Sequence, residues 1–537
     1  MTGGPAQNAL RVAVEGCGHG TLHSIYASVT RACEAKGWPG VDLLIIGGDF
    51  QAVRNAYDLN CMSVPKKYRE IGDFHEYYSG ARKAPYLTIF IAGNHEASNH
   101  LFELFYGGWV APNMYYMGAA NVLRLGPLRI AGLSGIWKGY NYRKPHHERL
   151  PYSENDIKSA YHVREFDTRK LMQIRTQVDV GLSHDWPKGI EWKGDFKTLF
   201  RRKDQFEADA KNGTLGSAAA KYVLDRLRPP HWFSAHLHIK YPAIVKHQDH
   251  SVATASTTGP TASTPEAKPQ KNMEEIDLDM EDEAEEVPLT ETSPIVSTDI
   301  DPASAANADE IKLGIDDDSL TAASEVPEEL RAKLPASFTT PRKPETLPFP
   351  DGISNKTTKF LALDKCLPNR DFLQVLEIES TTSNSTFERP LRLEYDKEWL
   401  AITRVFANDL VVGDHDAEVP PDMGDAHYRP LIEKEEAWVE EHVLKAGKMV
   451  IPEDFAITAP VYEPEYGPHV DGQPMEYTNP HTKAFCEMLQ IPNPFDISDE
   501  ERAARMAKGP REDEPRFGGG NRGGIDALSP QTYVHCK

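Results

Sequence analysis

The stretch Asp-Leu-Leu-Ile-Ile-Gly-Gly-Asp-Phe-Gln, residues 42–51, joins a buried strand to a candidate metal ligand. Residues 42–46 are short and mostly apolar, and two glycines follow them, which is typical of a strand inside a sheet. Gly48 lets the backbone turn sharply, so that the side chain of Asp49 can face the end of that strand. The stretch therefore predicts a sheet with a functional carboxylate at one strand end.

Four further blocks of this kind occur in the first half of the chain. Each is rich in residues that bind metals or move protons, and most follow a strand-like run directly. They are Gly-Cys-Gly-His-Gly (16–20), Gly-Asn-His-Glu (93–96), Ser-His-Asp-Trp-Pro (183–187) and Ser-Ala-His-Leu-His (234–238). Ligands bind at the carboxyl ends of strands in α/β sheets, so we expect the five blocks to meet in one metal site.

Strand-like and helix-like stretches alternate over residues 11–245, which predicts a layered α/β domain. The expected strands are β-branched or aromatic and are bounded by Gly, Pro or Asn. They cover residues 11–15, 42–46, 86–92, 122–125, 128–133, 178–182 and 232–234. Helices are expected at residues 23–36 and 218–227.

At 537 residues, the chain is too long for one ordinary core. We place the catalytic domain at residues 1–246 and a smaller α+β region at residues 350–490, as a domain or as an extension packed on the first. In that region we expect strands at 360–363, 372–379 and 391–404 and an amphipathic helix at 432–446. A flexible tail is expected at residues 502–537.

Residues 247–345 are rich in Ser, Thr, Pro and acidic residues and nearly lack aromatics. Such a segment cannot bury enough apolar surface to offset its ordering entropy, so we interpret it as a disordered acidic linker. Residues 271–330 hold 20 acidic residues against 2 lysines, whereas residues 1–250 carry 32 Lys and Arg against 24 Asp and Glu. The net charge of −22 therefore comes from the rest of the chain, and the catalytic half is mildly basic. This basic charge either attracts a polyanion or is ordinary variation of a protein surface.

The six cysteines are scattered, without a Cys-x-x-Cys pair, which indicates reduced thiols. No apolar run approaches the roughly 20 residues that a membrane helix needs. The first ten residues lack the basic and then apolar pattern of a secretion signal. We therefore expect an intracellular protein without membrane contact.

The ligand types in the blocks suit a first-row transition metal or zinc, and not calcium. Asp49 is the natural bridge, because one carboxylate can hold two cations. One pocket would be completed by Cys17, His19 and His238, and the other by Asn94, His184 and His236. Two cations held in this way can clamp a phosphate and activate a water molecule.

Two residues of the third block have different expected roles. His95 directly follows a candidate ligand and is not needed as one, so it is free to protonate a leaving oxygen as a general acid. Glu96 is expected to orient a histidine.

The blocks together resemble the calcineurin-like metallophosphoesterase superfamily, although that family usually opens with Asp-x-His where this chain has Cys17-Gly-His19. Four more stretches resemble the RNA lariat debranching enzyme family over roughly residues 11–245 and, more loosely, 350–490. They are Gly-Asp-Phe-Gln-Ala-Val-Arg-Asn (48–55), Gly-Asp-Phe-His-Glu-Tyr-Tyr-Ser-Gly (72–80), Ala-Pro-Asn-Met-Tyr-Tyr-Met-Gly (111–118) and Ser-Gly-Ile-Trp (134–137).

The resemblance implies a four-layer αββα sandwich that hydrolyses the 2′–5′ phosphodiester at the branch point of excised intron lariats. The family's metal ligands fall on Cys17, His19, Asp49, Asn94, His184, His236 and His238, and its proton donor falls on His95. The implied cofactors are one or two divalent ions, with Fe(II), Zn(II) and Mn(II) as the candidates. The thiolate of Cys17 is softer than the usual carboxylate, which leaves the metal identity open.

The stretch at residues 137–167 matches the position of the family's lariat recognition loop. Basic groups interleaved with aromatics there suit phosphates and unpaired bases. The residues expected to bind substrate are Lys138, Tyr140, Tyr142, Arg143, Lys144, His146 and His147, with Arg54 from the block at 48–55. Branched RNA is the expected partner, with proteins of the spliceosome or of intron turnover. The expected location is the nucleus, with the cytoplasm as a second location.

Two other functions share parts of this pattern. A protein Ser/Thr phosphatase has the same metal blocks, but it usually carries Asp-Arg-Gly shortly after Gly-Asp, where this chain has Phe50, Gln51 and Ala52. A non-catalytic scaffold on the same fold would normally have lost ligands that this chain retains.

Overall fold

Two β-sheets form the centre of the computed structural model, which describes residues 9–248, 347–381, 387 and 389–511. These residues fall in one of the two units into which the chain divides, and the other unit covers residues 251–343. Most of the predicted linker and the tail beyond residue 511 lie outside the described residues.

The first sheet places the metal blocks at 16–20, 42–51 and 93–96 side by side. Its order is β12 (Leu373–Glu379), β1 (Ala9–Glu15), β2 (Leu43–Ile46), β3 (Thr88–Phe90), β5 (Met114–Tyr116) and β4 (Gly108–Ala111). Strands β1, β2, β3 and β5 run parallel, with Val12 opposite Leu43. The blocks that follow β1, β2 and β3 therefore emerge at one edge of the sheet.

The second sheet places the metal blocks at 183–187 and 234–238 side by side. Its order is β10 (Tyr241–Lys246), β11 (Thr357–Ala362), β9 (His231–Ser234), β8 (Val180–Ser183), β7 (Leu128–Leu133), β6 (Ala120–Leu125) and β13 (Leu393–Tyr395). Strands β7, β8 and β9 run parallel, so the blocks after β8 and β9 leave the sheet at the same edge.

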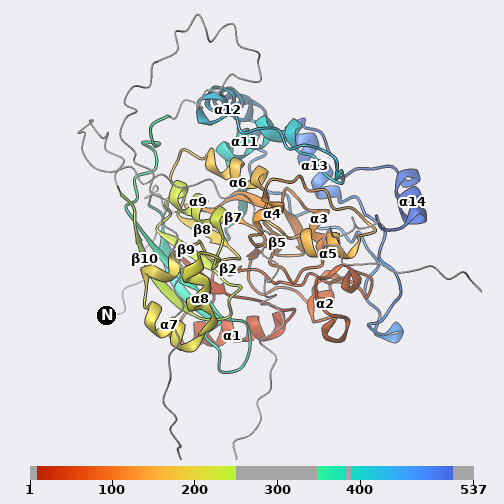
Figure 1. The fold of residues 1–537 in the computed structure, drawn as a ribbon, viewed down its shortest axis with the longest axis horizontal. Coiled ribbons are helices and arrows are strands. Elements are labelled where there is room, and N and C mark those ends of the chain that lie inside the picture. The colour runs from red at the N-terminus through yellow and green to blue at the C-terminus, as the bar shows by residue number, and fades with distance from the viewer. Residues whose placement is uncertain (1–8, 249–346, 382–386, 388, 512–537) are drawn as a thin grey trace, which may run out of the picture. The chain divides into compact units, whose positions relative to one another are not determined.

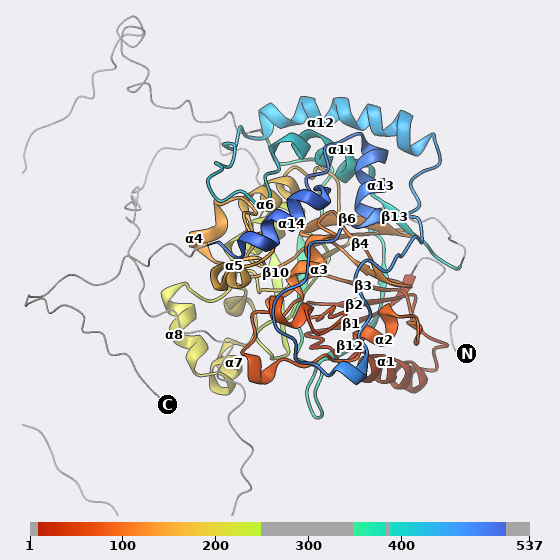
Figure 2. The ribbon, with the colours of Figure 1, turned by 90° about the vertical axis from the view of Figure 1, so that its right-hand side faces the viewer.

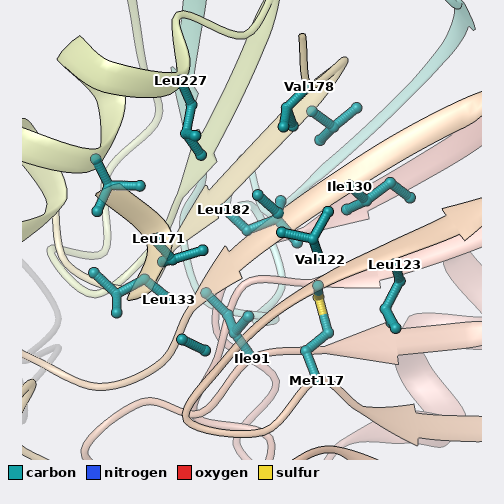
Figure 3. Close-up of a cluster of buried hydrophobic side chains, with 14 of the residues drawn as sticks. Ile91, Met117, Val122, Leu123, Ile130, Leu133, Leu171, Val178, Leu182 and Leu227 are labelled. Atoms are coloured by element: carbon teal, nitrogen blue, oxygen red, sulfur yellow. The ribbon is translucent and has the colours of Figure 1, made fainter. Parts of the chain in front are cut away.

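Alternation along the strands places apolar side chains on both faces of the first sheet. Val12 and Val14 of β1 join a core cluster shared with β6, β7 and β8 of the second sheet, so the two sheets pack face to face. Figure 3 shows part of this cluster, including Ile91, Val122 and Leu182. On the opposite face, Ala13 joins a second cluster with residues of α1.

Helices cover both outer faces and complete the predicted four-layer sandwich. Helix α1 (Leu22–Lys36) buries residues at helical spacing against the first sheet and ends at Gly37, whose φ of 67° is left-handed. Helices α6 (Glu165–Met172) and α9 (Ala218–Leu227) pack against the second sheet. In Figures 1 and 2, α1 and α12 (Asp425–Val439) lie at opposite ends of the ribbon.

The remaining α-helices lie between and around these elements along the chain. They are α2 (Phe74–Tyr78), α3 (Ser98–Phe102), α4 (Gly139–Tyr142), α5 (Glu154–Ser159), α7 (Phe196–Arg202), α8 (Gln205–Asn212), α11 (Lys397–Phe406), α13 (Pro480–Leu489) and α14 (Asp499–Lys508). No helix of the described ranges is long and apolar enough to cross a membrane.

The C-terminal region is built into both sheets. Strand β12 pairs with β1, β11 lies between β10 and β9, and β13 pairs with β6. Helix α11 packs against α12, and the two lie side by side in both views (Figures 1 and 2). The C-terminal region therefore contributes strands to both sheets and lies in the same unit as residues 9–248.

Two expectations for the C-terminal region are wrong. Residues 391–404 were predicted as one strand, but strand β13 ends at Tyr395 and α11 begins at Lys397. The side chain of Asp396 accepts the N–H of Trp399 at 3.1 Å and caps the helix, although the β-branched and aromatic residues resemble a strand. The tail predicted from residue 502 begins inside α14, which Ser498 caps.

Candidate metal centre

Left-handed backbone at residues other than glycine is concentrated in three of the five blocks, at 16–20, 42–51 and 234–238. Among the described residues, nine non-glycine residues have positive φ, and five of them lie in these blocks. They are His19, Asp49, Gln51, His236 and His238. Left-handed backbone at residues other than glycine costs free energy, and such strain is concentrated at functional sites. Backbone strain is thus concentrated at three of the segments that carry predicted ligands.

Four side chains meet there with metal-ligand geometry. One ligand atom from each of Cys17, His19, Asp49 and His238 lies within 4.8 Å of the others. The Nε2 atoms of His19 and His238 are 3.2 Å apart, and Asp49 Oδ2 is 3.6 Å from His19 Nε2. The sequence predicted this combination as the first pocket, and the structure brings all four residues together.

The other carboxylate oxygen of Asp49 faces His184. Its Oδ1 atom is 3.4 Å from His184 Nε2, and the His184 ring lies 5.0 Å from that of His236. His184 Nδ1 lies 2.8 Å from the carbonyl oxygen of Gly47 and donates to it, so Nε2 carries a lone pair. Among the described residues Nε2 has no hydrogen-bond partner. Two buried electron pairs facing each other fit a cation between them.

Glycines make room for this arrangement. A Cβ atom at Gly48 would lie 2.2 Å from His184 Nδ1, and one at Gly93 would lie 2.1 Å from Asp49 Oδ1. The glycines beside the ligands are therefore a steric requirement of the site, and Gly48 also has a φ of 121°.

Burial keeps the histidines neutral, which is the form that binds metals. It lowers the pKa of His19 to about 3 and that of His184 to about 4, although Asp49 opposes both shifts. For Asp49 itself burial would raise the pKa, but His184, His95 and His19 hold it well below its ordinary value.

Cys17 behaves differently from the histidines. Burial and then the neighbouring Asp49 raise the pKa of its thiol well above the ordinary value. A bound cation would favour the thiolate, because metal ligation deprotonates a thiol outright.

Glu96 of the block at 93–96 stabilises the backbone around the site through hydrogen bonds. Both oxygens of Glu96 accept backbone N–H groups, those of Phe50 at 2.9 Å, Gln51 at 2.9 Å and Gly93 at 3.0 Å. Glu96 therefore fixes two strand ends and not a histidine ring. Its pKa is raised to about 8 by burial and then by Asp49. Asn94, the remaining predicted ligand, is buried. The backbone N–H groups on either side of it, those of Gly93 and His95, donate to Glu96 and Asp49.

His95 sits beside the ligands without joining the cluster of four. Its backbone N–H donates to Asp49 Oδ1 at 2.9 Å, and its half-buried ring lies 5.2 Å from the His19 ring. The ring therefore lies at the border between the metal cluster and solvent.

The predicted recognition loop is an ordered segment that contains α4 and α5. Buried Glu148 accepts hydrogen bonds from Arg164 and Ser159 and ties the segment together. The N–H of Trp137 donates to Asp185 Oδ2 at 3.2 Å, which joins the start of the segment to the fourth metal block. Asp185 was not assigned a role from the sequence.

The predicted substrate-binding residues divide into outward and inward groups. Tyr140, Arg143 and Lys144 are exposed, and Lys138 and Tyr142 are half-buried. His147 is buried, and half-buried His146 pairs through Nε2 with Asp167 Oδ2 at 2.6 Å. The outward group can meet a large substrate, whereas the two histidines contact the protein.

Arg54 lies away from any substrate surface. Its side chain is 0 % exposed and binds Asp58 at 2.9 Å and Glu103 at 2.7 Å. It also donates to Thr458 at 3.0 Å, which connects the block at 48–55 to the C-terminal region. A buried guanidinium is retained only when it is paired, and Asp58 is the near neighbour that pairs it.

One charged residue near the metal cluster could not be recognised from local sequence. Lys365 pairs by a β-bridge with Cys17, and its charge helps to lower the pKa of His19. It comes from the C-terminal region, and nothing in residues 1–246 indicates that this segment reaches the site.

Comparisons with known proteins agree with this geometry. Residues 10–240 match the family model of calcineurin-like phosphoesterases, and residues 355–494 match that of the lariat debranching enzyme C-terminal domain. The lariat debranching enzyme of Schizosaccharomyces pombe is 38% identical over 485 residues, covering 89% of this chain and 95% of that protein.

Two mammalian relatives show a similar identity over a similar share of this chain. The human lariat debranching enzyme is 38% identical over 483 residues, covering 90% of this chain and 69% of that protein. The mouse enzyme is 39% identical over 483 residues, with 90% and 68% covered. The two matched ranges span the metal blocks and the C-terminal region, and the relatives cover about nine-tenths of the chain. This chain therefore belongs to the lariat debranching enzyme family, on the calcineurin-like phosphoesterase fold.

Proposed function

We propose that this protein hydrolyses the 2′–5′ phosphodiester at the branch point of lariat RNA and releases a linear RNA. The observation that carries the proposal is the cluster of Cys17, His19, Asp49 and His238, in a chain about nine-tenths of which aligns with lariat debranching enzymes. A cluster of this composition supports metal-dependent hydrolysis.

The donor set fits a divalent cation. His184 Nε2 and Asp49 Oδ1 lie 3.4 Å apart, and a neutral His184 that donates from Nδ1 to Gly47 turns the lone pair of Nε2 toward this carboxylate. The thiol of Cys17 adds a soft ligand. When bound, a divalent ion supplies Lewis acidity toward the phosphate and lowers the pKa of a water molecule. The thiolate and imidazole ligands favour Zn(II) or Fe(II) over Mn(II).

The arrangement of the ligands supports two ions. Asp49 Oδ2 lies on the side of His19, and Oδ1 lies on the side of His184. Cys17, His19 and His238 would complete one site, and Asn94, His184 and His236 the other, with Asp49 shared between them.

His95 supplies the proton for the leaving oxygen. The hydrogen bond from its N–H to Asp49 fixes the backbone beside the ligands, and its ring lies 5.2 Å from the His19 ring. From this position the imidazole can protonate the departing 2′ oxygen as a general acid.

The loop at 137–167 binds the RNA around the branch. Tyr140, Arg143 and Lys144 offer an exposed ring and two exposed cations on a segment that Trp137 anchors to the metal block. Aromatic stacking and cationic contacts suit unpaired bases and phosphates. His146, His147 and Arg54 support the structure instead of touching substrate.

A substrate of this kind also indicates where the protein acts. Excised introns arise in the nucleus, so we place the protein there, with the cytoplasm as a second location. Proteins of the spliceosome or of intron turnover are the expected partners.

The direct test is cleavage of a synthetic branched RNA by metal-stripped full-length protein, with Fe(II), Zn(II) and Mn(II) added separately. A linear 3′–5′ RNA and a phosphopeptide serve as matched alternative substrates. Cleavage of only the 2′–5′ bond with at least one metal supports the proposal. Activity on the phosphopeptide without cleavage of the branched RNA would overturn it.

A further inference from the structure

A basic surface with one exposed tryptophan follows the fourth metal block along the chain. It is formed by the 3₁₀ turn η3 (Ile190–Lys193), by helix α7 and by Lys188, two residues before the turn. We call it the α7 surface and define it by its exposed residues Lys188, Trp192, Lys193, Lys197, Arg201 and Arg202. Residues 188–203 contain six basic and two acidic residues.

The positive charge of the α7 surface is only partly offset by its acidic neighbours, since Asp195 interacts electrostatically with Arg201 and Glu191 with Lys188. Glu191 is 3 % exposed, and Asp195 accepts the N–H of Thr198 at 3.1 Å as the N-cap of α7. Within the described part of the chain, none of the five cationic side chains of this surface forms a salt bridge. Their combined field attracts a polyanion.

Trp192 gives this surface a stacking platform. Its side chain is 42% exposed, and its ring lies 5.3 Å from Phe196 and 5.4 Å from Phe200. These contacts hold the indole in place while almost half of the side chain remains in water. A fixed aromatic ring among cations is the combination that binds single-stranded nucleic acid, because every base has a π-face that can stack.

One end of the α7 surface, at Lys188, lies close to the metal centre. Lys188 is four residues beyond His184, so the two Cα atoms are no more than about 14 Å apart. The N–H of Lys188 donates to Ser217 at 3.0 Å, which fixes the start of the surface. On the other flank, Asp185 holds the start of the recognition loop. Figure 2 shows α4 of that loop and α7 along the same side of the ribbon.

We propose that the α7 surface binds one single-stranded arm of the branched RNA as it leaves the metal centre. This inference rests on the proposed function, because only a branched substrate has three arms at the scissile phosphate. The recognition loop occupies one flank of the fourth metal block. The α7 surface on the other flank offers cations for the phosphates and an indole for a base.

The arm length of the substrate provides the test. Full-length protein is given a minimal branched RNA of three nucleotides and a branched RNA with each arm extended to about ten nucleotides. The wild-type protein should have a higher kcat/KM for the long-armed RNA. In the variant Lys193→Ala/Lys197→Ala/Arg201→Ala this preference should fall about tenfold. The log–log salt slope for binding should decrease by about 2, because each neutralised phosphate of a single strand contributes roughly 0.7.

Trp192 is tested separately from the charges. Trp192→Ala should lower the preference for long arms at least about fivefold, the lower end of what one stacked base contributes. Trp192→Phe should restore most of it, since a phenyl ring still stacks. If both replacements lower the preference for long arms to a similar extent, stacking is not the role of Trp192. That result would overturn the claim that Trp192 stacks on a base of the RNA arm.

A control variant removes two positive charges elsewhere on the surface. Lys434 and Lys448 are exposed and form no salt bridge with any described residue, so Lys434→Ala/Lys448→Ala should keep the preference. If wild-type protein cleaves neither RNA, the proposed function itself fails. If it cleaves both and the triple variant keeps the full preference for long arms, only the inference about the α7 surface fails.

Discussion

The backbone N–H of His236 donates a hydrogen bond to Cys17 Sγ at 3.2 Å, across 219 positions of sequence. This contact joins the first metal block to the last and points the sulfur into the ligand cluster. The N–H also favours the thiolate, although burial and Asp49 raise the pKa of Cys17 overall. The thiol is thus positioned for a metal ion whose charge would deprotonate it.

Cys17→Ser should weaken the binding of soft metals selectively. A hydroxyl in place of the thiolate removes the ligand that Zn(II) and Fe(II) prefer, so their affinities should fall by about tenfold or more, with a smaller loss for Mn(II). Competition with a chelator of known affinity measures each value. Cys33→Ser, a buried cysteine of α1 outside the cluster, should bind metals like the wild type. Equal losses for all three metals would show that Cys17 does not select the ion.

His95→Ala should separate metal binding from turnover. The side chain lies outside the cluster of four, and its backbone contact with Asp49 survives the replacement. We expect unchanged metal content and a fall in kcat of about 10²–10⁴ on branched RNA, the usual contribution of a general acid. Elemental analysis and single-turnover kinetics measure the two quantities. Wild-type turnover by this variant would remove His95 from the mechanism.

Asp396→Ala should loosen the attachment of the C-terminal region. Buried Arg129 of β7 donates to Asp396 Oδ1 at 2.6 Å and to Glu398 Oε2 at 2.9 Å. Removing Asp396 leaves a buried guanidinium with an incomplete set of partners, which costs about 3–5 kcal/mol of unfolding free energy. Urea unfolding measures this change. Glu440→Ala breaks the partly exposed pair with Lys397 and should cost less than about 1 kcal/mol. Equal effects of the two variants would contradict the structural role of Arg129.

Hydrophobic patterning and glycine placement predict the N-terminal strands well. The helix at Ala218–Leu227 and the strand at Leu128–Leu133 have the predicted bounds, because each is a periodic run with a clear boundary. The cluster of four was predicted because its residues follow parallel strands, whose ends are adjacent in any sheet of this kind.

Contacts between distant segments could not be predicted. The sequence around Arg54 does not reveal that Asp58 and Glu103 enclose it, so an internal ion pair resembled a substrate contact. The insertion of β11 between β10 and β9 depends on a pairing more than 100 residues away along the chain. At residue 396, one capping hydrogen bond decided between strand and helix, and propensity alone favoured the strand.

Glu148→Gln should make the stability of the recognition loop less dependent on pH. Burial would raise the pKa of Glu148, but Arg164 and His147 lower it to about 2. A depressed pKa in the folded state means that the stabilisation is complete above the unfolded value near 4.5 and is lost as the pH falls toward 2. The difference corresponds to about 3 kcal/mol.

We therefore expect Glu148→Gln to unfold at lower urea concentration than the wild type at pH 7. The gap, which is the difference between the two unfolding midpoints, should close at about pH 2–3. The closing gap identifies ionisation, because a loss of packing alone would persist at every pH. Glu154→Gln, an exposed carboxylate in the first turn of α5, is the matched control and should change stability by only a few tenths of a kcal/mol. A gap of constant size between pH 7 and 3 would mean that the charge of Glu148 does not stabilise the loop.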